Sequence, residues 1–357
     1  MTSANDKMQE IAVRSGLATP PANILMALSG GVDSVSLLHW LTAIGHRPIV
    51  AHFNHRWYPC EDGFAAFCKK IAHAHSLQFV CGKSHGKIQR TETAAREERY
   101  AFLAETARAH NCDKVVVAHT ACDQAETVLM RLIRGSGSHG LSAMKKAVSR
   151  GGVTLLRPWL ELSRREVLAY ARKHRLEWVE DPVNSETFRL RSRVRKRLIP
   201  YLKKHFHPDI SSALCRTATV LSDEDSWLHE LAVSQLSSVR DRSLPHRIVI
   251  PALASLPICQ QRRVVKLWLE SEAIADISWT DIESVLALCD LEHPPKINLA
   301  GNRFVRRREK RLFVEVQPTA SRPSHRNQPA ASSRKRQSPS GKKQAAQPDS
   351  SREQKRL

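Results

Sequence analysis

The first half of the chain alternates short apolar runs with longer stretches of helical periodicity. The runs are rich in Val, Ile, Leu or Phe, which is typical of strands that are buried on both faces of a sheet. Strands that alternate with helices pair in parallel through crossover connections, so we predict an α/β domain with a parallel sheet. The expected strands are residues 24–28, 49–53, 77–81, 115–118 and 154–156, and the helices between them are residues 34–44, 62–75, 93–110 and 124–134.

Beyond the last of these strands the pattern becomes helical. Ser163 and Glu166 form a capping-box sequence that predicts the start of one more helix. After about residue 206, amphipathic helical stretches dominate, and short strands are expected only at residues 247–250 and 311–316. We therefore predict an α/β domain over residues 1–205 and a smaller, mainly helical domain over residues 206–317.

The charge of the chain favours a polyanionic partner. Its 357 residues include 56 Lys and Arg against 35 Asp and Glu, a net charge of +21, which is typical of nucleic-acid-binding proteins. Residues 318–357 hold ten basic and two acidic residues with almost no apolar ones, and this composition predicts a disordered tail. The tail is either a solvated extension or an RNA-binding arm, and the remainder of the chain is basic without it.

Neither a membrane span nor a secretion signal is expected. No run of 18 or more apolar residues occurs, and the N-terminus lacks a basic stretch followed by an apolar one. The eight cysteines are scattered, without C-x-x-C or zinc-ligand spacing, as in proteins of a reducing compartment. The sequence therefore predicts a cytoplasmic location and no membrane partner.

A polar, glycine-rich segment follows the first expected strand. It reads Ser-Gly-Gly-Val-Asp-Ser and consists of Ser29, Gly30, Gly31, Val32, Asp33 and Ser34. Glycines at a strand-to-helix junction allow close approach of an anion and positive φ, and the serine hydroxyls and helix-start N–H groups can bind phosphate. A phosphate would repel Asp33 unless a cation lay between them, which predicts Mg²⁺. The segment matches neither G-x-x-x-x-G-K-[ST] nor G-x-G-x-x-G, which argues against P-loop kinases and dinucleotide-dependent dehydrogenases.

More polar residues follow the fourth expected strand and therefore belong to the same edge of the sheet. Of these, Asp123 could share Mg²⁺ with Asp33 or orient an incoming amine, or it could simply cap a helix. Arg96 and Arg99 could clamp a phosphate or a carboxylate, or could be solvated residues on a helix face. The complete set after the fourth strand is His119, Asp123, Glu126 and Thr127.

A strip of basic residues lies between residues 189 and 204 and includes no acidic residue. Surface solubility rarely needs so much charge of one sign, so the strip favours a surface that follows the phosphates of a nucleic acid. The preceding Asp181 and Asn184 either fix the adjacent loop or are ordinary turn residues. The strip consists of Arg189, Arg191, Arg193, Arg195, Lys196, Arg197, Lys203 and Lys204.

The Ser-Gly-Gly-Val-Asp-Ser segment resembles the pyrophosphate-loop (PP-loop) motif of the ATP pyrophosphatase family, whose members cleave ATP between its α and β phosphates. Four further stretches are similar to tRNA(Ile)-lysidine synthetases, and the resemblance covers about residues 22–204. Thr120, Cys122 and Ser192 depart from the family pattern, where a histidine, an aspartate and an asparagine are usual. The four stretches are "AHFNHRW", "TETAAREERYAFL", "AHTACDQAETVLMRLIRGSGSHGL" and the segment from "LLRPWLELSRREV" to "RVRKRLIPYL".

The resemblance implies a reaction. ATP adenylates the C2 carbonyl oxygen of the wobble cytidine in a tRNA(Ile) with anticodon CAU, pyrophosphate leaves, and the amine of free L-lysine then attacks C2 and displaces AMP. Residues 1–205 would be the catalytic domain, residues 206–317 would bind tRNA or another substrate, and the basic strip would follow the phosphates of the tRNA. This changes the specificity of the tRNA from Met to Ile. His52 and Phe53 would join the PP-loop in binding ATP, Asp33 and Asp123 would hold Mg²⁺, and Arg96 would belong to the catalytic group. Lysine attacks only as a neutral amine, so we expect Asp123, or less readily His119, to act as the base.

Two alternatives from other classes stay open. One is a different PP-loop enzyme, such as a tRNA thiolase or an amide-forming synthetase, although Cys81, Cys112 and Cys122 lack the thiolase motifs. The other is a non-catalytic tRNA-binding protein, which would bind with steep salt dependence and turn over no ATP. A homodimer is compatible with the sequence but is not indicated by it.

Overall fold

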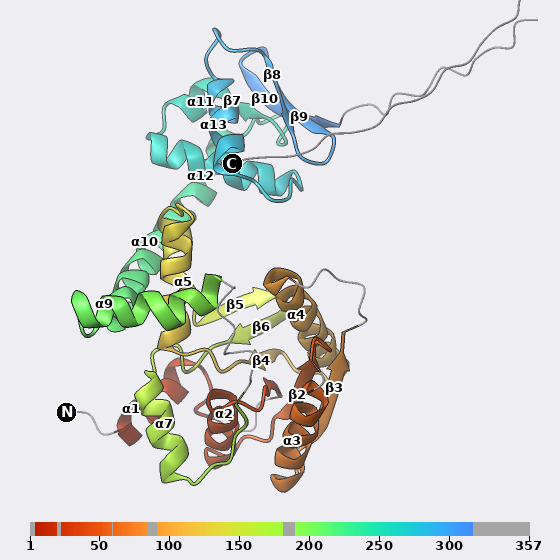
Figure 1. Cartoon of the computed structure of the whole chain (residues 1–357). Helices are drawn as coiled ribbons and strands as arrows, with labels where there is room; N and C mark the ends of the chain where they lie inside the picture. The colour runs from red at the N-terminus through yellow and green to blue at the C-terminus, as the bar shows by residue number, and fades with distance from the viewer. Residues whose placement is uncertain (1–3, 20–22, 59, 85–90, 181–189, 317–357) are drawn as a thin grey trace, which may run out of the picture.

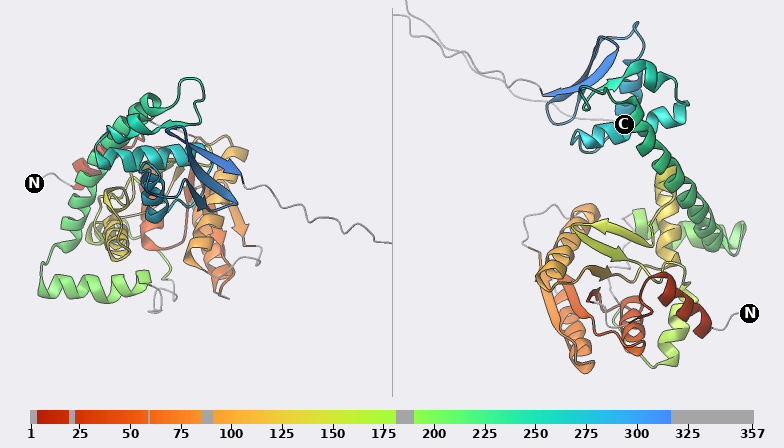
Figure 2. Two further views of the ribbon diagram at one scale, coloured as in Figure 1. Left: turned by 90° about the horizontal axis from the view of Figure 1, so that it is seen from above. Right: turned by 180° about the vertical axis from the view of Figure 1, so that it is seen from behind.

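The computed structural model describes residues 4–19, 23–58, 60–84, 91–180 and 190–316. The predicted tail, together with Arg189, Asp181 and Asn184, lies outside these residues. Figure 1 shows a large α/β body formed by the first part of the chain and a smaller body formed by its end. A single long helix, α10, runs from one body to the other, as both views of Figure 2 show.

The predicted parallel sheet is present and has six strands in the order β3-β2-β1-β4-β6-β5. Leu25 in β1 pairs in parallel with Ile49 on one side and with Val115 on the other. Only β5 is antiparallel, and it was not predicted because this four-residue edge strand is largely exposed and carries no buried apolar run. The strands are β1 Ile24–Ala27, β2 Ile49–Asn54, β3 Phe79–Lys83, β4 Lys114–Val116, β5 Ala147–Arg150 and β6 Val153–Leu156.

Helices cover both faces of this sheet because its strands are apolar on both sides. Ile24 and Met26 of β1 pack into one core with α2, α3 and α7, whereas Leu25 between them packs into a second core with α4. This alternation follows from the strand, in which successive side chains point to opposite faces. The helices of the body are α1 Ala4–Arg14, α2 Val32–Ala43, α3 Glu61–Ala74, α4 Glu92–Ala109, α5 Ala121–Ile133, α6 Ser138–Leu141 and α7 Arg164–Lys173.

A basic helix follows the large α/β body and contains one widened turn. It runs through α8 Leu190–Arg193, a π-helical turn at Val194–Leu198 and α9 Ile199–His205. Pro200 lies just after the widened turn, and a proline inside a helix has no N–H to donate and clashes with the carbonyl four residues earlier. The π-helical turn accommodates Pro200 without ending the helix.

The smaller body combines helices with a four-stranded antiparallel sheet in the order β7-β10-β9-β8. The sequence predicted helical stretches at α10, α12 and α13 and two of the strands, but it missed α11, β8 and β9. The signal of β9 is obscured by a run of arginines that ends the strand. The elements are α10 Ile210–Val239, β7 Ile248–Val249, α11 Ile250–Ala254, α12 Ile258–Ser271, α13 Trp279–Ala287, β8 Lys296–Leu299, β9 Arg303–Arg308 and β10 Arg311–Val316. Within the described residues, no helix is long and apolar enough to span a membrane.

A buried carboxylate joins the two bodies. Asp225, on α10, has a side chain that is only 2% exposed. It accepts hydrogen bonds from His139 in α6, at 2.9 Å, and from Arg263 in α12, at 2.8 Å. Arg263 also donates to Ser138. The glycine-containing turn after α5 is thereby connected to the smaller body through one side chain.

We expect Asp225→Asn to lower the free energy of unfolding by about 1–3 kcal/mol, because Arg263 would lose its buried charged partner. Burial alone would raise the pKa of Asp225, but His139 and Arg263 hold it below its usual value. The stabilisation is therefore complete above about pH 4 and is lost as the pH falls through this lowered pKa. Thermal unfolding of both proteins across this pH range measures the effect.

The matched control is Glu224→Gln, at an exposed neighbouring position on the same helix. It should change stability by less than about 0.5 kcal/mol. Equal effects of the two substitutions would contradict a specific role for Asp225.

Candidate active site

A cavity of about 420 Å³ lies at the carboxyl ends of β1, β2 and β4. Ligands of open α/β sheets bind at this edge. The cavity brings together Ser29, Asp33, Ser34, His52, Phe53, His119, Asp123, Arg191 and Arg195 from the predicted site. It also includes Arg99 and an apolar wall formed by Ala51, Leu103, Val117 and their neighbours. Gly30, Gly31, Val32, Arg96, Arg193, Lys196 and Arg197 are not among the residues that line it.

The two glycines of the PP-loop play different roles. Gly30 has φ +88°, and a Cβ atom there would lie 2.9 Å from Val179, so this position requires glycine. Gly31 has φ −74°, which any residue adopts, and a Cβ atom there would make only ordinary contacts. Our expectation of positive φ was therefore right for Gly30 and wrong for Gly31.

Hydrogen bonds within the PP-loop fix its shape before any ligand binds. The buried Ser34 hydroxyl donates to the Gly31 carbonyl at 3.0 Å and accepts from the Ser29 N–H at 3.2 Å. The Val179 N–H donates to the Gly30 carbonyl, so the segment before the undescribed residues 181–189 supports the loop. Helix α2 begins directly after the loop, and the N–H groups of a first helical turn have no partners within the helix. The loop is thus a preformed site for an anion.

Asp33 pairs with Arg164, the first residue of α7. The Arg164 guanidinium donates to Asp33 Oδ1 at 2.6 Å. Burial raises the pKa of Asp33, the charge of Arg164 opposes this, and the charge of Asp123 adds to it. Asp33 and Asp123 are therefore close enough to disfavour each other's ionisation, which a cation between them would relieve.

His52 lies beneath the PP-loop with a defined tautomer. Its Nδ1–H donates to the Leu28 carbonyl at 2.8 Å, which leaves Nε2 as an acceptor. Burial lowers the pKa of His52, so the ring is neutral at pH 7. The neighbouring Asn54 donates to Asp62 and accepts from the Arg56 N–H, and it thus shapes the loop after β2.

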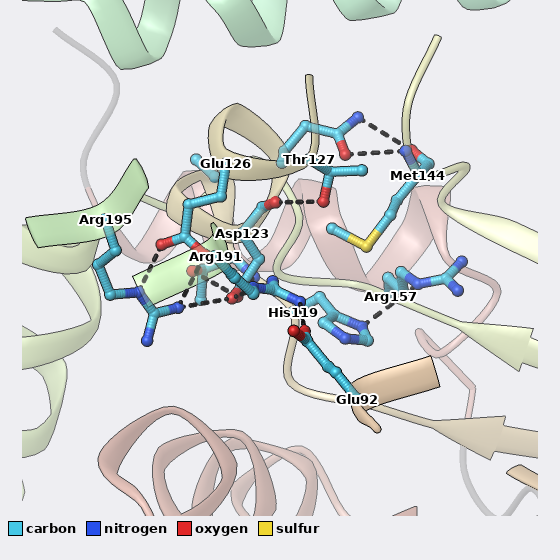
Figure 3. Close-up of polar contacts among 12 residues, drawn as sticks. Glu92, His119, Asp123, Glu126, Thr127, Met144, Arg157, Arg191 and Arg195 are labelled. Carbon is cyan, nitrogen blue, oxygen red and sulfur yellow. Dashed lines mark hydrogen bonds and ion pairs between the residues drawn. The ribbon is translucent and has the colours of Figure 1, made fainter. Parts of the chain in front are cut away.

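Two arginines bind two carboxylates at the start of α5 (Figure 3). Arg191 donates to Glu126 at 2.9 Å and to Asp123 at 3.0 Å. Arg195 donates to both oxygens of Glu126, at 2.5 and 3.0 Å, and to Asp123 at 3.2 Å. The Glu126 side chain is 1% exposed, so these bonds compensate for a buried charge. Thr120 donates its N–H and its hydroxyl to the other oxygen of Asp123.

This arrangement decides the charge states around Asp123. Burial would raise the pKa of Asp123, but Arg191, Arg195 and the Thr120 N–H bring it below its usual value, so Asp123 is an anion at pH 7. Burial lowers the pKa of His119, which is therefore neutral. Arg157 donates to Nδ1 of His119 at 3.3 Å, so its proton is on Nε2, as a donor. In this tautomer, His119 cannot accept a proton at Nε2.

The arginines of α4 gather around the buried ring of Tyr100. The guanidinium of Arg96 lies 5.0 Å and that of Arg99 5.5 Å from the ring centroid, and Arg150 lies 4.5 Å from it. Burial lowers the pKa of Arg99, and the nearby Arg96 and Arg191 lower it further. Arg99 is thus not simply a solvated residue on a helix face, because it lines the cavity among other cations and favours an anionic ligand.

The basic strip divides between two sides of its helix. Arg191 and Arg195 turn toward Asp123 and Glu126, whereas Arg193, Lys196 and Arg197 are exposed and form no ion pair within the described part of the chain. The carboxylates of α5 are the physical reason, because buried negative charge attracts the nearest guanidinium groups. A phosphate-binding role stays a prediction for the exposed part of the strip, and Arg189 lies outside the described residues.

The two predicted magnesium ligands differ in how well they fit. Asp33 lines the cavity and has one oxygen bonded to Arg164, which leaves its second oxygen as a hard donor. Both oxygens of Asp123 already accept hydrogen bonds from Thr120, Arg191 and Arg195. Asp33 is therefore suited to be one ligand of a magnesium ion, whose other ligands would be phosphate oxygens and water. Asp123 could be a ligand only if it gave up its hydrogen bonds with the arginines.

Three site residues were not selected from the sequence as functional. Glu126 was noted beside Asp123, but its burial depends on tertiary contacts. Arg164 gave a weak signal, because a positive charge at a helix N-terminus is unfavourable and needs a partner such as Asp33. Arg157, which fixes the His119 tautomer, gave no distinct signal.

We expect Glu126→Gln to lower the free energy of unfolding by about 1–3 kcal/mol, because it removes one buried charge from between two guanidinium groups. Thermal unfolding measures this change. Glu92→Gln is the matched control, because Glu92 lies 3.8 Å from Arg191 but is 45% exposed. The control should have little effect, and an equal loss in both variants would exclude burial as the cause.

The comparisons with known proteins agree with this geometry. The family model of the PP-loop domain matches residues 2–202, and that of the TilS substrate binding domain matches residues 249–313. A tRNA(Ile)-lysidine synthase from Synechocystis sp. is 34% identical over 298 residues, which are 79% of this chain and 88% of the relative. One from Gloeobacter violaceus is 38% identical over 264 residues, which are 71% of this chain and 78% of the relative.

A solved structure shows the same fold. A tRNA thiolase from Methanococcus maripaludis, with its [4Fe-4S] cluster, has a TM-score of 0.51 and 18% identity. The match covers 61% of this chain and 78% of the thiolase. At this identity, the likeness concerns the fold alone.

Proposed function

The chain belongs to the tRNA(Ile)-lysidine synthase family, and from this premise we propose that it joins L-lysine to C2 of the wobble cytidine in a tRNA(Ile) with anticodon CAU. Membership makes it an ATP-dependent ligase that modifies tRNA and is built on a PP-loop domain. The proposed products are lysidine, AMP and pyrophosphate, and the proposed place of action is the cytoplasm.

The observation that carries this proposal is that one cavity combines an anion-binding loop, two carboxylates and an apolar wall. The preformed loop between β1 and α2 supports binding of the ATP phosphates, and the apolar wall with Phe53 supports binding of the adenine ring. Asp33 is proposed to hold Mg²⁺, which would neutralise the charge of the departing pyrophosphate. The first step then makes the C2 oxygen part of a good leaving group.

Charge complementarity supports the binding of lysine at Asp123. Asp123 is anionic at neutral pH and lies in the cavity wall, so it can hold the side-chain amine of lysine near the activated cytidine. A carboxylate with a lowered pKa is a weak base, and we therefore propose that orientation is the larger part of its role. The cationic pair Arg96 and Arg99 is the proposed partner of a substrate carboxylate or phosphate.

We expect Asp33→Asn to reduce lysine transfer by about 100-fold or more, because the variant loses the carboxylate proposed to hold the Mg²⁺ that neutralises the phosphate charge. The measurement is incorporation of labelled lysine into bacterial tRNA with ATP and Mg²⁺, while AMP and pyrophosphate are followed. Asp113→Asn, at an exposed residue just before β4, is the control. If wild-type protein formed AMP without transferring lysine, the PP-loop chemistry would stand and the proposed acceptor would be wrong.

Asp123→Asn should reduce lysine transfer more strongly than it reduces pyrophosphate release, because its charge acts on the amine in the second step. Both products are measured in single-turnover reactions on the same tRNA. Asn keeps the shape of the side chain and can accept one hydrogen bond from Thr120. Full lysine transfer by this variant would eliminate Asp123 as the amine-orienting group.

A further inference from the structure

A second concave surface lies on the outer side of the basic helix. It is an open groove of about 370 Å³ between the end of α5 and the helix that runs through α8 and α9. It is lined by Ile133, Leu190, Arg193, Val194, Arg197, Leu198 and Tyr201, and we call it the outer groove. Its walls are mostly apolar side chains, with two arginines among them.

Aromatic rings are exposed at one end of the outer groove. Tyr201 is 55% exposed and Phe206 is 71% exposed. The rings of Tyr201 and His205 lie 4.6 Å apart, and Phe206 lies 5.9 Å from Tyr201, so the three rings form a small cluster. Ile133, at the opposite wall, is 56% exposed. Exposed apolar surface of this kind marks an interaction site more often than a solvated face.

The charge around these rings is of one sign. No acidic residue occurs between residues 190 and 208, and five basic side chains of this helix are exposed, of which Arg193 and Arg197 line the groove. Within the described residues, none of the five forms an ion pair. These residues are Arg193, Lys196, Arg197, Lys203 and Lys204. Rings beside unpaired cations suit a ligand that has both a flat apolar face and negative charge, which is the chemistry of a nucleotide.

We propose that the outer groove binds an unpaired nucleobase of the RNA substrate, adjacent in the RNA to the nucleotide that enters the catalytic cavity. The inference rests on the proposed function for the identity of that RNA. Tyr201 stacks on the base, and the surrounding Arg and Lys side chains bind the flanking phosphates.

The position of the groove supports this assignment. Arg191 and Arg195 on the same helix face the catalytic cavity, while Arg193, Arg197 and Tyr201 face the groove. A helix with its side chains is only about 10–12 Å across. An RNA strand that passes over this helix can therefore reach both sites with neighbouring nucleotides, which a base-paired strand cannot do because its bases are stacked inside the duplex.

The test uses a synthetic RNA hairpin whose loop contains the target cytidine, with 2-aminopurine at one neighbouring loop position at a time. Stacking on a ring changes the fluorescence of 2-aminopurine. Wild-type protein should give this change at one loop position and should bind the hairpin more tightly than a duplex of the same stem. We expect Tyr201→Ala to abolish the change and to weaken hairpin binding by about 5- to 100-fold, with duplex binding unaffected.

Two control variants separate stacking from other effects. Tyr201→Phe keeps the ring and should behave like the wild type. Trp227→Ala removes another exposed aromatic side chain, 65% exposed on α10, and should leave hairpin binding unchanged. Arg197→Gln should instead weaken the binding of both the hairpin and the duplex and reduce the salt dependence of binding, because it removes a phosphate contact.

The outcomes distinguish this inference from the proposed function. Failure of lysine transfer by wild-type protein, with the Tyr201-dependent fluorescence change intact, would overturn the substrate assignment and leave the base-binding groove in place. Equal binding of the hairpin by Tyr201→Ala and wild type would overturn the groove proposal. So would a dimer of wild-type protein that Tyr201→Ala dissociates without any change in RNA affinity.

Discussion

The buried carboxylate of Glu126 constrains much of the architecture around the site. A charge that is almost fully excluded from water must be paired, and Arg191 and Arg195 supply the partners from a helix 65 and 69 residues further along the chain. The same two arginines bind Asp123. The pairing therefore fixes the basic helix against α5, closes one wall of the cavity and turns the remaining basic residues of that helix outward.

The local parts of the site could be predicted from the sequence, because each follows from neighbouring residues. The loop from Ser29 to Ser34 is defined by its glycine, serine and aspartate spacing, and the strand patterns place it beside His119 and Asp123. The pairs between Arg164 and Asp33 and between Arg191 and Glu126 could not be predicted. They depend on how helices pack, which the spacing of residues along one helix does not encode.

The missed strands have a similar explanation. Strand β5 is an exposed edge strand, and β9 combines Val305, which packs into the core of the smaller body, with four arginines. Apolar periodicity detects buried elements, so it found the central strands of the large sheet and overlooked strands that gain their stability from ladder hydrogen bonds.

The ion pairs also explain why Asp123 suits orientation better than proton abstraction. Two guanidinium groups and the Thr120 N–H stabilise its charged form, so the proposed lysine substrate would meet an anion that can orient its amine. The same stabilisation weakens Asp123 as a base. Since His119 presents a proton at Nε2 because Arg157 donates to its Nδ1, the proton of the attacking amine has no strong acceptor in this wall. In the proposed reaction, lysine would therefore attack as a neutral amine oriented by Asp123, and the proton lost as the C–N bond forms would leave with the phosphate of the departing AMP or pass to water.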